Sequence, residues 1–111
     1  MVYDAPSIQR ELSMITEIAD FKIRPEQRAD FLAAIHQAAR LHLSRSPGYV
    51  SHQILPCIET AGRVVLIVQW ESLEAHTVGF RQSSAFPEWR ALIGPFFMEP
   101  PQVEHFELSA A

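Results

Sequence analysis

The sequence predicts an α+β fold of the ferredoxin-like, split β-α-β type, built on a four-stranded antiparallel sheet. Three observations carry this prediction: the order of the elements, an aliphatic run at residues 64–68, and a wide apolar helical stripe over residues 25–44. The expected elements are strands at 14–23, 49–58, 64–70 and 102–108 and helices at 25–44, 73–81 and 85–93. With 111 residues, the chain forms one domain at 13–108 behind a tail or arm at 1–12.

The run at residues 64–68 contains five aliphatic residues, four of them β-branched, and such side chains suit a pleated strand. Alternate side chains of a strand point to opposite faces. One face holds Val64, Leu66, Val68 and Trp70, and the other holds Val65, Ile67 and Gln69. Helices cover only one face of this sheet type, so the second apolar face predicts a homodimer with an isologous interface.

Local signals define the ends of the helices. Pro25 suits the first position of the helix at 25–44, and Ser46-Pro47-Gly48 forms a turn after it. Ser72 is a good N-cap for the helix at 73–81, on which Leu73, His76 and Phe80 share one side. Ser83 or Ser84 is expected to cap the helix at 85–93, which Gly94-Pro95 ends.

Composition excludes several classes of function. A net charge of −4 argues against a nucleic-acid partner, and the longest aliphatic run is too short to span a membrane. Cys57 is the only cysteine, so the chain has no internal disulfide and no CxxC motif. No basic region followed by an apolar run opens the sequence, and we expect a cytoplasmic protein. His36, His42 and His52 lack metal-ligand spacing, so we expect no metal site.

Two long stretches carry a family resemblance. Residues 68–97 read VQWESLEAHTVGFRQSSAFPEWRALIGPFF, and residues 100–107 read PPQVEHFE. Together with FKIRPEQRADFLAAI and the turn Pro47-Gly48-Tyr49, they resemble the antibiotic biosynthesis monooxygenase family over about residues 13–108. The resemblance implies the dimeric α+β barrel. It also implies a choice among cofactor-free oxygenases of polyphenols, haem-degrading enzymes and isomerases of small signalling molecules.

The resemblance separates two of these branches. The haem-degrading branch uses an Asn on the first strand and a haem-ligating His on the last helix, where this chain has Ala19 and Arg90. The cofactor-free branch uses a Trp at the end of the third strand, and Trp70 matches it. The resemblance therefore favours the cofactor-free branch.

Four residues are candidates for catalysis, each with a structural alternative. Trp70 could donate its indole N–H to a substrate oxygen or could be a core aromatic. His76 could act as a general base or could be a helix histidine whose ring reaches solvent. His105 could act as a general base or could be an edge histidine paired with a neighbouring glutamate. Arg90 and Arg81 could each stabilise an oxyanion or pair on the surface, and Arg81 is expected to pair with Glu74 or Glu88. Candidate substrate-binding aromatics, alternatively ordinary core, are Phe80, Phe86, Trp89 and Phe97.

These observations predict a cofactor-independent monooxygenase that acts on a small electron-rich aromatic, such as a hydroquinone or polycyclic phenol, with dioxygen as co-substrate. No cofactor is expected, because the chain has no Gly-rich phosphate loop and no ligand cluster. Two alternatives share the fold: a non-oxidative isomerase that uses acid–base chemistry, and a small-molecule-binding dimer without catalysis.

Overall fold

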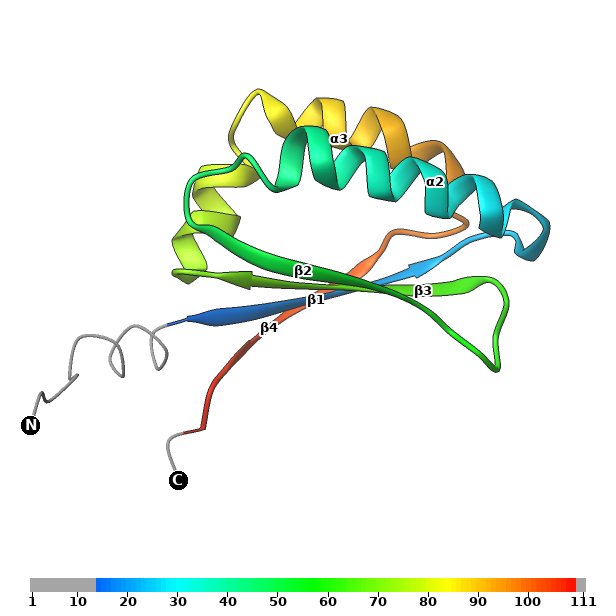
Figure 1. The fold of residues 1–111 in the computed structure, drawn as a ribbon, viewed down its shortest axis with the longest axis horizontal. Coiled ribbons are helices and arrows are strands. Elements are labelled where there is room, and N and C mark those ends of the chain that lie inside the picture. Colours follow the sequence, from blue (N-terminus) through cyan, green and yellow to red (C-terminus); the bar gives the residue numbers. More distant parts are fainter. Residues whose placement is uncertain (1–13, 110–111) are drawn as a thin grey trace, which may run out of the picture.

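The computed structural model describes residues 14–109, so the predicted tail at 1–12 lies outside the described residues. Its four strands are β1 (Ile15–Lys22), β2 (Tyr49–Pro56), β3 (Arg63–Trp70) and β4 (Gln102–Glu107). All neighbouring strands are antiparallel, and their order across the sheet is β2-β3-β1-β4. The predicted α+β, ferredoxin-like fold is confirmed (Figure 1).

The helices lie on one face of the sheet, as predicted (Figure 1). The first begins as the short 3-10 segment η1 (Pro25–Gln27), continues as α2 (Arg28–Ala38) and ends in the π-helical η2 (Ala39–Leu43). The second long helix, α3 (Ala85–Ile93), lies in the same layer and is followed by the 3-10 turn η4 (Gly94–Phe96). Within residues 14–109 no helix is long and apolar enough to cross a membrane.

The segment between β3 and α3 differs from the prediction. Ser72 accepts the backbone N–H of Ala75 at 3.1 Å, which is the expected cap, but the segment then widens into the π-helix η3 (Ala75–Phe80). His76 and Phe80 lie within this π-helix and are buried together, whereas Leu73, which precedes it, is 39% exposed.

The predicted cap of α3 is wrong. No side chain caps that helix, and the Ser83 hydroxyl instead donates to the carbonyl of Phe80 at 2.7 Å. This bond ties the end of η3 to the start of α3, so the two helical segments have a defined relative placement.

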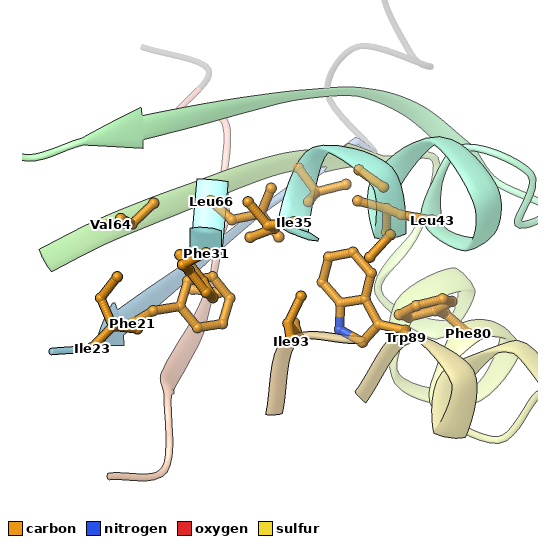
Figure 2. Close-up of a cluster of buried hydrophobic side chains, with 14 of the residues drawn as sticks. Phe21, Ile23, Phe31, Ile35, Leu43, Val64, Leu66, Phe80, Trp89 and Ile93 are labelled. Atoms are coloured by element: carbon orange, nitrogen blue, oxygen red, sulfur yellow. The ribbon is translucent and has the colours of Figure 1, made fainter. Parts of the chain in front are cut away.

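One core fills the space between the sheet and the helices. The helix-facing residues of β3, from Val64 to Trp70, are at most 1% exposed. Phe31 and Ile35 of α2 pack against them together with Trp89 and Ile93 of α3 (Figure 2). This packing confirms the face assignment of β3 and the apolar stripes of both helices.

No helix within residues 14–109 lies over the opposite face of the sheet (Figure 1). Ile67 of β3 lies at its centre, opposite Ile18 of β1 and Gln53 of β2, and is half-buried. Towards the edges of this face, Leu55 and Phe106 are 43% and 47% exposed. The described part of the chain thus presents a partly apolar sheet surface without cover.

Candidate active site

The register of three strands places a carboxylate on the helix-facing side of the sheet. Glu17 of β1 lies opposite Val68 of β3 and opposite His105 of β4. Its side chain points into the same layer as Ala19 and Phe21, which occupy alternate positions of β1, and it is only 5% exposed. A buried carboxylate needs compensating partners, because removing it from water is costly.

Trp70 and His76 supply those partners. The indole Nε1–H of Trp70 donates to Oε1 of Glu17 at 2.9 Å. The imidazole of His76 stacks on the Trp70 indole, with ring centroids 5.2 Å apart, and its Nε2 lies 3.4 Å from the same Glu17 oxygen. On its other side, Nδ1 of His76 shares a 2.7 Å hydrogen bond with Nε2 of His105. We call Glu17, Trp70, His76 and His105 the Glu17 cluster.

Burial governs the charges of the Glu17 cluster. It raises the pKa of Glu17, against the lowering effects of the Trp70 hydrogen bond and the charge of Arg81. Burial, together with the charges of Arg81 and His105, lowers the pKa of His76 to about 3. Burial and the charge of Arg81 also lower the pKa of His105. The 3.4 Å contact between Glu17 and His76 would suit an ion pair, but burial disfavours charge on both groups. We therefore assign uncharged imidazoles at neutral pH.

A cavity of about 460 Å³ opens beside the Glu17 cluster. This volume is within the range of small-molecule sites. Its lining combines a polar end with apolar and aromatic walls. The lining residues are Glu17, Ala19, Phe21, Leu66, His76, Arg81, Phe86, Trp89, Arg90, Phe97, Pro100, Pro101 and Val103. The cavity can hold a planar apolar ligand with one end at a carboxyl group.

The predicted site residues fall into two groups. Those that line the cavity are His76, Arg90, Phe86, Trp89 and Phe97. The other three lie behind the lining. Trp70 is fully buried with its N–H occupied by Glu17, His105 is hydrogen-bonded to His76, and Phe80 packs between Trp70 and Trp89.

Sequence reasoning missed Glu17 and misplaced Arg81. Glu17 occupies an inward position in the alternation of β1, and that position was the available signal. Arg81 lines the cavity, and among the described residues it makes no ion pair with Glu74 or Glu88; Glu88 instead contacts His42 at 3.6 Å. Within residues 14–109 no group of three or more His, Cys, Asp or Glu side chains could hold a metal ion.

The sequence profile described as antibiotic biosynthesis monooxygenase matches residues 14–92. The chain belongs to the antibiotic biosynthesis monooxygenase family. It is 40% identical over 94 residues to the uncharacterized protein YczJ of Bacillus subtilis (strain 168), covering 85% of this chain and 98% of that one.

Solved structures of the antibiotic biosynthesis monooxygenase family share the architecture. A Bordetella bronchiseptica protein provisionally assigned to this family is 42% identical, covers 87% of this chain and 98% of its own, and superposes with a TM-score of 0.81. A variant of SnoaB, a cofactor-independent oxygenase from Streptomyces nogalater, superposes with a TM-score of 0.68 at 19% identity, covering 88% of this chain and 93% of that one. At that identity, SnoaB supports the fold alone.

In this member of the antibiotic biosynthesis monooxygenase family, Trp70→Phe is expected to shift the pH dependence of activity towards alkaline pH. The Trp70 hydrogen bond lowers the pKa of Glu17, so its removal is expected to raise that pKa further. The measurement is kcat/KM against pH. Trp89→Phe, which removes the other indole, is the control and should not shift the profile. An unchanged profile for Trp70→Phe would show that this hydrogen bond does not set the pKa that governs activity.

Proposed function

We propose that the chain is a cofactor-independent monooxygenase that acts on a small electron-rich aromatic, a hydroquinone or a polycyclic phenol. The observation that carries this proposal is a carboxyl group with a raised pKa that faces an aromatic-walled cavity. A carboxylate whose pKa is raised towards neutrality is a stronger base than an exposed one, so it suits removal of a phenolic proton.

The reaction needs only the bound phenol and dioxygen. Glu17 takes the phenolic proton, and the resulting phenolate passes one electron to dioxygen, giving an aryloxyl radical and superoxide. These combine at a ring carbon that bears hydrogen, forming a C–O bond and, after proton uptake, a hydroperoxide. Loss of that C–H hydrogen and cleavage of the O–O bond leave a quinone carbonyl. One oxygen atom of dioxygen is then in the product, and the other leaves as water with the two hydrogens lost by the substrate.

The histidines provide a route for the proton. His76 contacts Glu17 on one side and His105 on the other, and His105 is only partly buried. An uncharged imidazole can accept a proton at one nitrogen while it releases the proton of the other. In the proposed mechanism, His76 and His105 carry the proton between Glu17 and solvent.

Acid–base isomerisation is the second candidate. The contact between Glu17 and His76 favours it, because a neutral carboxyl and imidazole pair can remove a proton from one substrate atom and return it to another. This reaction consumes no oxygen, so oxygen uptake separates the two candidates.

The test is oxygen uptake by the purified, metal-stripped protein with a panel of hydroquinones and anthrone-like phenols, corrected for autoxidation. We expect enzyme-dependent uptake of one dioxygen per quinone formed, with a single labelled oxygen in the product when ¹⁸O₂ is supplied. Substrate conversion without uptake would favour isomerisation, and binding without conversion would favour a ligand-binding protein.

We also propose that the protein is a homodimer joined through the uncovered sheet face. Half-buried Ile67, at the centre of this face, should be fully buried by a second copy.

Ile67→Asp is therefore expected to give a monomer, because burying an unpaired charge in the interface is costly. Light scattering coupled to size exclusion measures the mass. Ile58→Asp is the control, since Ile58 is 92% exposed in the turn after β2. A monomeric wild type would refute the proposal.

A further inference from the structure

We propose that the substrate is a hydroxyaromatic acid, whose carboxylate binds Arg81 and Arg90 at the cavity mouth while its hydroxyl end reaches Glu17. This inference rests on the proposed function, because it takes the cavity as the substrate site. It adds a charged group to the substrate class, which the aromatic walls alone do not require.

The charge of the cavity lining supports an anionic ligand. Two guanidinium groups line the cavity, and among the described residues the only carboxyl group in the lining is that of Glu17. Burial holds Glu17 towards its neutral form. The lining is thus positively charged although the chain carries a net charge of −4. A cleft with one sign of charge attracts ligands of the opposite sign.

Arg90 is held in a position that suits a carboxylate. Its guanidinium carbon lies 5.9 Å from the ring centroid of Phe86 and 5.6 Å from that of Phe97, so the group is held between two aromatic walls of the cavity. Contacts of this kind do not use up the N–H donors of the guanidinium, which can bind both oxygens of a carboxylate. A ligand bound there would have its ring beside Phe86 and Phe97.

Arg81 connects the cavity mouth to the Glu17 cluster. It directly follows η3, where its backbone N–H donates to the carbonyl of His76 at 3.0 Å. Its charge acts on the pKa of Glu17, His76 and His105 alike, which places it within electrostatic reach of all three. In the part of the chain that the structure describes, neither Arg81 nor Arg90 forms an ion pair with an acidic side chain.

The burial of the polar lining residues agrees with a ligand that has two polar ends. Glu17 and His76 are buried residues of the lining, whereas Arg81 and Arg90 are exposed to solvent. Apolar side chains of Phe86, Trp89 and Phe97 lie in the same lining. A volume of about 460 Å³ accommodates a compound of about two or three fused rings.

The test compares the binding of 6-hydroxy-2-naphthoate with that of its methyl ester by titration calorimetry. The two probes have the same rings and hydroxyl group and differ in the charge of the carboxyl group. We expect the acid to bind about tenfold more tightly than the ester at about 0.05 M salt, equivalent to about 1.4 kcal/mol. The preference should shrink at about 0.5 M salt, because exposed charges are screened.

Variants of the two arginines test which residues cause the preference for the acid over the ester. Arg81→Gln and Arg90→Gln are each expected to reduce the ratio of ester to acid dissociation constants about threefold, as is typical of one exposed ion pair, and to leave ester binding nearly unchanged. Arg40→Gln is the matched control, since Arg40 is an exposed arginine of η2 outside the cavity lining. Thermal unfolding of each variant verifies that the fold is retained.

Each outcome decides the inference. Equal binding of acid and ester, binding of neither, or equal losses in Arg40→Gln and Arg90→Gln would overturn it. Oxygen uptake with neutral phenols only would also overturn it and leave the monooxygenase proposal intact. A preference for the acid that depends on the two arginines would support it. If hydroxyaromatic acids then bind without oxygen uptake, the acid-binding site stands and the oxygenation proposal fails.

Discussion

Glu17→Gln is expected to lower kcat by about 100-fold or more, because a positioned general base typically contributes 10²–10⁴-fold to a rate. The substitution is nearly isosteric, and the amide oxygen of glutamine can still accept the Trp70 N–H that binds Oε1 of Glu17 at 2.9 Å. Substrate binding and fold should therefore persist while proton removal is lost. The measurement is kcat and KM for oxygen uptake with a substrate identified in the phenol panel.

The control for this variant is Glu26→Gln, which changes an exposed carboxylate of η1 outside the cavity lining. It should leave kcat unchanged. The pH profile adds a second readout: in the wild type, kcat/KM should rise with pH through the raised pKa of Glu17, and this limb should disappear in Glu17→Gln. A Glu17→Gln enzyme that retains half of the wild-type kcat would show that another group, such as His105, is the base.

The second large effect expected is acid destabilisation that depends on His76. The pKa of His76 is about 3 in the folded chain and 6.5 as a free group, so between these values the unfolded state binds the extra proton. The contribution to stability is complete above pH 6.5 and is lost as pH falls towards 3. A pKa difference of this size corresponds to roughly 5 kcal/mol as an upper limit, and we expect about half of that between pH 7 and pH 4.

Titration of Glu17 changes stability with pH in the opposite direction, so the comparison is made in proteins that carry Glu17→Gln. Its raised pKa means that the folded state retains a proton which the unfolded state loses, so stability falls as pH rises above 4.5. The comparison is therefore between Glu17→Gln and Glu17→Gln/His76→Gln, by urea unfolding at several pH values.

Glu17→Gln should lose stability as pH falls from 6.5, and Glu17→Gln/His76→Gln should lose clearly less stability over the same pH range. Adding His36→Gln, at an exposed position of α2, to Glu17→Gln is the control and should leave the acid loss in place. Parallel stability curves for all three proteins would contradict the assignment of a buried, uncharged His76.

The fold was predictable because its signals are local. An uninterrupted aliphatic run indicates a strand covered on both faces, the stripe over residues 25–44 indicates a helix with one buried side, and Gly and Pro mark the ends. The structure places Val64, Leu66 and Val68 in the core, as the alternation of β3 requires. There are two exceptions: the segment after Leu73 becomes π-helical, and at the start of α3 the Ser83 hydroxyl binds a carbonyl in place of capping the helix.

The candidate site was only partly predictable, because its residues come from separate strands. His76, Arg90 and three aromatic residues belong to one continuous stretch that also carries the family resemblance, and all of them line the cavity. Glu17 lies 53 positions from Trp70, and only the tertiary structure shows the hydrogen bond between them. No local sequence pattern predicts the contact between Trp70 and Glu17.

The sequence by itself determined the element order, the two apolar faces of β3 and the family. Those follow from the spacing of side chains along a regular backbone, which is set by neighbouring residues. Tertiary structure alone decided that Trp70 donates to Glu17, that His76 joins Glu17 to His105, and that Arg81 lines the cavity. These contacts depend on the antiparallel register of β1, β3 and β4 and on where η3 packs against the sheet. Strand register and helix placement are long-range outcomes of burying one common core.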